Sequence, residues 1–194
     1  MKFKIFSFKS VTSTNEVAIK LIRQEAKISG CVHAEKQTKG KGTHGKRWIS
    51  RKGNLFLSIF FPLKKNFPTF DEFSIINAII ISGVIKNFCK RKIVNLKFPN
   101  DILINGKKVS GILQEIIDLN TKKFLIVGIG INVLSNPDIK NKYKATNILK
   151  ETQKRLNIIE VMNFITFSYE KFFTNLNSYN YVNFKKKAES MTLN

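Results

Sequence analysis

Cysteine and histidine are scarce in this sequence of 194 residues, which contains only two of each. Cys31 and Cys89 are too few for a disulfide scaffold and lack the spacing of a metal site, so we expect reduced, buried thiols in a cytoplasmic protein. A zinc site at His33 or His44 would need cysteine or carboxylate ligands that the sequence does not arrange around them. The sequence therefore assigns no metal ion to protein side chains.

The sequence also lacks a long apolar run and a signal peptide, so neither a membrane span nor a membrane partner is expected. Acidic residues are few, and 13 of them against 34 lysines and arginines give a formal net charge of +21. Such a charge favours a nucleic-acid partner, because cationic side chains neutralise phosphates. Arginine, the preferred reader of bases, is nevertheless rare, and the lysines are spread along the whole chain. Specific DNA binding is therefore not predicted, and a non-catalytic basic protein that binds nucleic acid stays an alternative.

The spacing of apolar residues predicts helices and strands in one α+β domain over residues 1–178. Asn105-Gly106 lies between two apolar runs and is the strongest short signal for a β-hairpin. A polar connection is expected over 136–154, and a short basic segment over 179–194 ends the chain. We expect helices over 13–30, 71–90 and 158–176, and strands over 2–9, 31–36, 54–62, 93–98, 102–104, 107–117 and 124–133.

The segment 37–48 contains three glycines and four cationic side chains and ends on the only tryptophan, Trp48. Glycine-rich turns bring backbone N–H groups close to an anion, and the cations suit a phosphate or a carboxylate. The glycine spacing matches a dinucleotide fingerprint, but a strand-like run follows where that motif needs a helix. It also begins a P-loop, but Arg47 replaces the Ser or Thr that would hold Mg²⁺. The segment is therefore a phosphate-binding loop of another kind or a solvated basic turn.

Two further groups of residues have both a local and a ligand-binding interpretation. Ser13-Thr14-Asn15 precedes a helix, and Ser13 with Glu16 has the spacing of a capping box, which is the favoured interpretation. The same polar groups could instead bind a polar ligand. Gly128 and Gly130 interrupt the last strand, where glycine often marks the close approach of a ligand.

Four segments, in this order, resemble the catalytic domain of biotin protein ligases over about residues 8–175. They are Ser13-Thr14-Asn15, the loop 37–48, the stretch 97–115, which contains Lys97-Phe98-Pro99-Asn100-Asp101 and Lys108-x-x-Gly111-Ile112-Leu113-x-Glu115, and Gly128-Ile129-Gly130-Ile131-Asn132-Val133. The resemblance implies a fold related to class II aminoacyl-tRNA synthetases, a mixed and largely antiparallel sheet with helices packed on one side. It also implies two reactions, adenylation of biotin by ATP with Mg²⁺ and transfer of biotin to a lysine of a biotin carboxyl carrier protein. A monomer or weak homodimer is expected.

The resemblance assigns roles to individual residues. Lys108 reaches the biotin carboxylate and the α-phosphate, Asp101 is the base that deprotonates the incoming lysine, and Lys41 is the third catalytic residue. Biotin-binding residues are Ser13, Thr14, Asn15, Gln37, Lys41, Gly42, Thr43, Lys108, Gly111, Leu113 and Gly130. Residues on the ATP or adenylate side are Gly40, Lys46, Arg47, Trp48, Lys97, Asn100 and Asn132.

The sequence also departs from the family pattern. Relatives have arginines at the positions of Lys41 and Thr43, and a tryptophan at the position of Phe98. No helix-turn-helix precedes residue 1, so the repressor role of some relatives is not expected. The small C-terminal barrel of many relatives is also missing. Lipoate ligases and octanoyltransferases share the fold and remain the alternative within it, although the pentapeptide 97–101 favours biotin.

Overall fold

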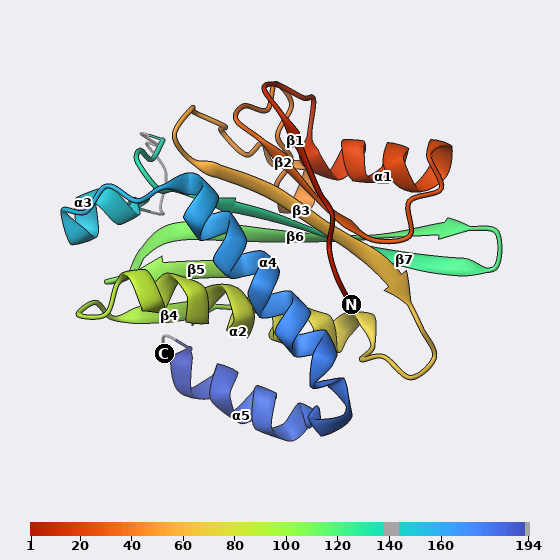
Figure 1. The fold of residues 1–194 in the computed structure, drawn as a ribbon. Helices are drawn as coiled ribbons and strands as arrows, with labels where there is room; N and C mark the ends of the chain where they lie inside the picture. The colour runs from red at the N-terminus through yellow and green to blue at the C-terminus, as the bar shows by residue number, and fades with distance from the viewer. Residues whose placement is uncertain (138–143, 193–194) are drawn as a thin grey trace.

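The computed structural model describes residues 1–137 and 144–192. Seven strands form one sheet in the order β1-β2-β3-β7-β6-β5-β4 (Figure 1). Strands β1 and β2 are parallel and all other neighbours are antiparallel, which confirms the predicted mixed, largely antiparallel α+β fold. The strands are β1 (Ile5–Phe8), β2 (Gly30–Ala34), β3 (Leu55–Leu63), β4 (Val94–Lys97), β5 (Asp101–Ile104), β6 (Lys107–Leu119) and β7 (Lys122–Ile131). The helices are α1 (Thr14–Gln24), α2 (Phe70–Phe88), α3 (Ile148–Thr152), α4 (Ile158–Thr174) and α5 (Tyr181–Met191).

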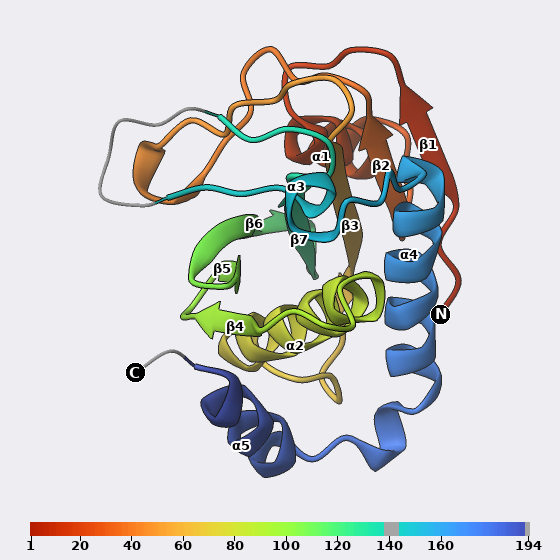
Figure 2. The same cartoon turned by 90° about the vertical axis from the view of Figure 1, so that its left-hand side faces the viewer.

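One face of the sheet is covered by α2 and α4, and α5 lies outside α2 (Figure 2). This face holds the larger apolar core, in which Phe61 of β3 packs against Phe73 of α2 and Phe173 of α4 with ring centroids 5.2 and 4.8 Å apart. None of the described helices is long and apolar enough to cross a membrane.

Helix α1 lies on the opposite face, over β2, β3 and β7. Its buried residues Leu21 and Ile22 pack with Phe60 and Ile126 in a separate, smaller core. The expected packing of helices on one side therefore holds for α2, α4 and α5, whereas α1 is an exception. The reason lies in β3, which is apolar on both faces and can bury a helix on each of them. Beyond α1, this second face carries the pocket described below.

The predicted hairpin at Asn105-Gly106 is confirmed. Asn105 and Gly106 have φ values of 50° and 74°, as a two-residue turn of this hand requires, and they join β5 to β6. The predicted capping box of Ser13 and Glu16 is wrong, because Ser13 precedes α1 without a capping hydrogen bond from its side chain. The Glu16 carboxylate instead bonds to Thr12 and pairs with Lys41 at 2.9 Å, and these contacts lower its pKa.

The C-terminal segment, expected only as short and basic, forms α5. Its Ala188 is buried against the core, and Asn95 of β4 donates a hydrogen bond to the Met191 carbonyl at 3.3 Å. The polar connection expected over 136–154 contains α3, and its residues 138–143 lie outside the described part of the chain. Both cysteines are free and buried, and burial raises the pKa of Cys31 to about 12 and that of Cys89 to about 11.

His33 of β2 gives a testable pH dependence of stability. It is buried, and neither ring nitrogen has a hydrogen-bond partner among the described residues. Burial lowers its pKa, and the charge of Glu35 opposes this in part. In the unfolded state the His33 imidazole has a pKa of about 6.5 and binds a proton more readily than in the folded state. The folded state is therefore fully stable above that pH. Below it, the free energy of unfolding falls by up to about 1.4 kcal/mol per pH unit. Between about pH 7.5 and about pH 5, the unfolding temperature of His33→Leu should therefore fall less than that of the native chain. An equal loss in both proteins would contradict this.

Candidate functional site

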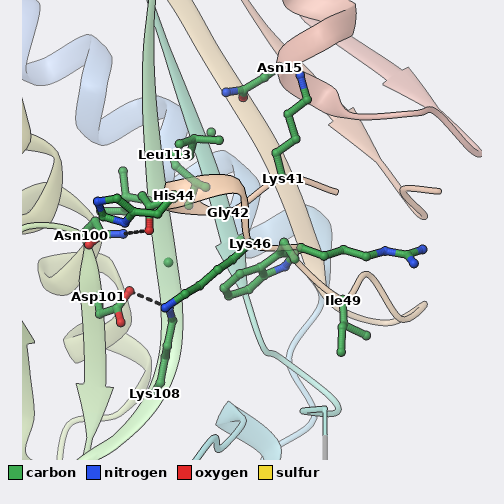
Figure 3. Close-up of a pocket in the computed structure, with 18 of the residues that line it drawn as sticks. Asn15, Lys41, Gly42, His44, Lys46, Ile49, Asn100, Asp101, Lys108 and Leu113 are labelled. Carbon is green, nitrogen blue, oxygen red and sulfur yellow. Dashed lines mark hydrogen bonds and ion pairs between the residues drawn. The ribbon is translucent and has the colours of Figure 1, made fainter. Parts of the chain in front are cut away.

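A cavity of about 440 Å³ opens on the face that carries α1, between the loop 37–48 and strands β5, β6 and β7. Figure 3 shows Asp101 and Lys108 on the left and the loop residues Lys41 and Gly42 to their right, with His44 of the same loop near Asn100. Eighteen of the residues predicted for the site line this cavity, and Gly40 is not among the lining residues. Those that line it are Ser13, Thr14, Asn15, Gln37, Lys41, Gly42, Thr43, Lys46, Arg47, Trp48, Lys97, Asn100, Asp101, Lys108, Gly111, Leu113, Gly130 and, completing the set at the end of β7, Asn132.

One end of the cavity, called the neutral end below, is lined by buried uncharged polar side chains, and Lys41, paired with Glu16, extends toward it (Figure 3). Ser13, Thr14 and Asn15 have at most 3% of their surface exposed, and none of them is used up in capping α1. The backbone N–H of Thr14 donates to Gln37 Oε1 at 2.8 Å, and the Gln37 amide donates to Ser50 Oγ at 3.0 Å. The structure therefore gathers the residues of the Ser13-Thr14-Asn15 motif and Gln37 at one place, where they can hydrogen-bond a neutral polar ring.

The other end of the cavity is ionic. Lys108 Nζ lies 2.6 Å from Asp101 Oδ1 (Figure 3). It also lies 5.5 Å from the centre of the Trp48 ring. Asp101 Oδ1 is buried and accepts no well-directed hydrogen bond from the described residues, so its attraction to Lys108 is one of charge. Asn100 donates to Thr43 Oγ1 at 3.3 Å and so connects the loop to β5. This end can therefore bind an anion beside a carboxylate.

Glycines on the cavity floor make room for side chains of the protein itself. A Cβ atom at Gly111 would lie 2.7 Å from the Trp48 ring, one at Gly130 would collide with the same ring, and one at Gly128 would meet the amide of Asn15. The sequence predicted that Gly128 and Gly130 admit a ligand, and the structure shows that they admit Asn15 and Trp48. The indole Nε1 of Trp48 is buried without a partner among the described residues, so it can donate to a ligand.

Trp48, as the only tryptophan, reports on this packing through its fluorescence. In Gly130→Ala the new methyl group should displace the indole, because β7 is paired on both sides and cannot move away. We expect a red-shifted emission that marks exposure of the ring to water. Gly83→Ala is the matched control, since a Cβ there meets nothing within 4 Å. An unchanged spectrum in Gly130→Ala would contradict this packing.

The loop itself has neither of the two phosphate-motif geometries. A short 3₁₀ turn (Thr43–Gly45) with His44 at φ 55° replaces the helix that a dinucleotide fingerprint or a P-loop would open, and β3 follows. Among the described residues, no three His, Cys, Asp or Glu side chains come together as a metal site. The cations of the loop are partly engaged, since Lys41 pairs with Glu16 and Arg47 donates to the Thr38 carbonyl at 2.8 Å.

Sequence reasoning missed the residues that support the cavity from behind. Ser58 Oγ is hydrogen-bonded to Thr14 and Asn15, and Glu115 Oε2 accepts from Asn15 Nδ2 at 2.6 Å. Ser58 had a usable signal, because it is the only hydroxyl in the apolar run of β3. Glu115 belongs to a motif quoted above but had no role assigned to it.

Comparisons with known proteins relate this chain to one family. A family model described as "Biotin/lipoate A/B protein ligase family" matches residues 7–132. The bifunctional ligase/repressor BirA of Bacillus subtilis is 30% identical over 192 residues, which cover 94% of this chain and 58% of that protein. The biotin–[acetyl-CoA-carboxylase] ligase of Paracoccus denitrificans is 30% identical over 128 residues, 65% of this chain and 53% of that protein. This chain thus spans less than two thirds of either curated relative.

A solved structure extends the similarity to the fold. The biotin protein ligase from Aquifex aeolicus, solved in complex with biotin and ATP, superposes with a TM-score of 0.81 and 31% identity. The match covers 98% of this chain and 78% of that one.

Proposed function

Because this chain belongs to the biotin/lipoate A/B protein ligase family, we propose that it activates biotin with ATP and transfers it to a lysine of a biotin carboxyl carrier protein. In the first step a biotin carboxylate oxygen attacks the α-phosphorus of ATP, the bond to the β-phosphate breaks, and pyrophosphate leaves. In the second step a lysine amine attacks the carbonyl of biotinyl-5′-AMP, the bond to AMP breaks, and an amide forms. The amine gives up its proton to a base in this step.

The observation that carries the proposal is the division of one cavity into a neutral and an ionic end. Lys108, at the ionic end, suits the biotin carboxylate and the α-phosphate, two anions that must be brought together. Asp101 beside it is the proposed base, and Trp48, Asn100 and Asn132 line the cavity on the proposed adenylate side. A Mg²⁺ ion accompanies the nucleotide in this scheme. Asp101 is the only carboxylate among the residues that line the cavity, so the described side chains do not form a metal site for it.

Biotin is favoured over lipoate by the neutral end. Ser13 and Thr14 contribute hydroxyl groups to the cavity lining, to which a cyclic urea can hydrogen-bond and a dithiolane or an alkyl chain cannot. The Aquifex aeolicus ligase, which superposes on this chain, was solved with biotin and ATP.

The proposal is tested by mass spectrometry of a biotin carboxyl carrier domain after incubation with this chain, ATP and Mg²⁺. Biotin, lipoate and octanoate are offered in parallel, and a carrier whose acceptor lysine is changed to arginine is the control. We expect biotin to be attached to the native carrier alone. Modification by lipoate or octanoate instead, or no modification by any acid, would contradict the proposal.

The Thr43 position leads to a prediction about retention of the intermediate. Relatives place an arginine there, whose planar fork can hold a phosphoryl and a carbonyl oxygen together. In this chain Thr43 accepts a hydrogen bond from Asn100, and the neighbouring Lys41 is paired with Glu16. Without a charge-assisted contact worth about 1.5–3 kcal/mol, biotinyl-5′-AMP should escape roughly 10- to 150-fold faster. Escaped adenylate would biotinylate lysines of bystander proteins.

The measurement is biotin labelling of a bystander protein by the native chain and by Thr43→Arg. We expect Thr43→Arg to label the bystander protein roughly 10- to 150-fold less than the native chain does. Thr38→Arg is the matched control, because it adds the same charge to the same loop at a residue outside the cavity lining. Negligible labelling by the native chain, or equal labelling by all three proteins, would show that the loop retains the adenylate by other contacts.

A further inference from the structure

We propose that Glu115 is a positioning residue that fixes the direction of the hydrogen bonds at the neutral end of the cavity. This inference rests on the proposed function and names the feature of the ligand that the site selects, a ring N–H donor. Glu115 does not line the cavity. It reaches the cavity through Asn15, whose Nδ2 donates to Glu115 Oε2 at 2.6 Å.

The Asn15 amide rests on three neighbouring strands of the sheet. Ser58 of β3 is paired in register with Gly128 of β7, and Glu115 lies on β6, on the other side of β7. A Cβ atom at Gly128 would overlap the Asn15 amide, so the missing side chain is what lets the amide lie on the sheet. The amide therefore bridges the strands, with its oxygen at Ser58 and its nitrogen at Glu115.

The chemistry of the groups fixes the direction of each hydrogen bond. A carboxylate only accepts, so the NH₂ group of Asn15 must face Glu115 and its oxygen must face Ser58. An amide oxygen also only accepts, so the single hydroxyl proton of Ser58 goes to Asn15. The hydroxyls of Ser58 and Thr14 lie 2.7 Å apart, and Thr14 must then supply the proton between them.

The consequence reaches the cavity at Thr14. Gln37 Oε1 accepts from the Thr14 backbone N–H at 2.8 Å and lies 3.2 Å from the Thr14 hydroxyl oxygen. The hydroxyl proton nevertheless goes to Ser58, because the two hydroxyl oxygens are only 2.7 Å apart and need a proton between them. The Thr14 oxygen that lines the cavity is thus left as an acceptor, and a ligand has to donate to it. The cyclic urea of biotin carries N–H donors, whereas a dithiolane ring and an alkyl chain carry none. Such ligands offer no donor to this oxygen, which is a basis for discrimination.

The test replaces Glu115 by glutamine, which keeps the size of the side chain but can donate as well as accept. The Asn15 amide then has no enforced orientation, and Thr14 is no longer held as an acceptor. We expect Glu115→Gln to weaken biotin binding at least tenfold in isothermal titration calorimetry. Desthiobiotin, which keeps the cyclic urea, should be weakened by the same factor. With the ligand bound, turnover of biotin should keep its native kcat, because the ionic end is unchanged. Asp118→Asn is the matched control, since this β6 carboxylate is exposed and pairs with Lys123 at 2.8 Å.

Two additional variants separate positioning from general stability. Glu115→Asp keeps an acceptor-only group and should recover part of the affinity. Glu115→Gln combined with Ser58→Ala should bind biotin no more weakly than Ser58→Ala alone, because that change already cuts the chain of hydrogen bonds. Native affinity in Glu115→Gln, or losses that simply add in the double variant, would overturn the inference. The two failures can be told apart. If the native chain binds no biotin, the proposed function is wrong. If the native chain and Glu115→Gln bind biotin equally well, only the role of Glu115 is wrong.

Discussion

Lys108→Ala is expected to slow adenylation of biotin by about 10²–10³-fold, which is the cost of removing one fixed charge from a reacting centre. Lys108 is held in place by Asp101 at 2.6 Å and by the face of Trp48, and its side chain is only 28% exposed. It therefore needs little reorganisation to meet two anions. The rate of adenylate formation in a single turnover with saturating biotin and ATP measures the effect directly.

Lys107 provides the matched control, because it is the preceding residue on the same strand and has the same chemistry. It is not among the residues that line the cavity, and its Nζ lies 3.9 Å from a carboxylate oxygen of Glu151 in α3. Lys107→Ala should therefore leave the adenylation rate nearly unchanged. Equal, small effects of the two substitutions would show that Lys108 does not act at the reacting centre.

Asp101→Asn is expected to slow transfer from preformed biotinyl-5′-AMP to a carrier lysine by about 10²-fold or more, since only a deprotonated amine is a nucleophile. In the free protein the Asp101 carboxylate is engaged by Lys108. In our account the adenylate draws Lys108 toward its own oxygens, which leaves Asp101 to accept the proton. Adenylation should be affected less than transfer, because Lys108 is retained.

The alternative is that Asp101 merely closes the bend between Pro99 and β5, as turn aspartates often do. The two roles are separated by measuring transfer and thermal unfolding on the same variant, with Asp118→Asn as the control for loss of an exposed Lys–Asp pair. A variant that transfers biotin at the native rate and only unfolds at a lower temperature would show that Asp101 is structural.

Features that depend on neighbouring residues in the sequence could be predicted well. The Asn105-Gly106 hairpin needs only two residues with positive φ between two apolar runs. Eighteen of the residues that line the cavity were predicted because they occur in short motifs whose order resembled one family. The strand β3 was predicted from its apolar run, but that run does not alternate, so it could not show that α1 covers one face and α2 and α4 the other.

Features that depend on distant residues could not be predicted. Ser13 has the sequence context of a helix cap, and its actual position at the cavity depends on where α1 rests on the sheet. The partners of Asn15 are 43 and 100 positions away, at Ser58 and Glu115, and nothing local indicates them. The assignment of Gly111 and Gly130 to the ligand stays a prediction, and nothing local indicated that these glycines also make room for Trp48.

The central claim is that this chain activates biotin, and biotin-dependent exchange of pyrophosphate into ATP tests it most directly. The assay needs no carrier protein and reports only the reversible first step. Our account predicts exchange that requires biotin, is not supported by lipoate, and is lost in Lys108→Ala but retained in Lys107→Ala. Exchange that depends on lipoate instead, or no exchange with either acid in a folded native chain, would contradict it.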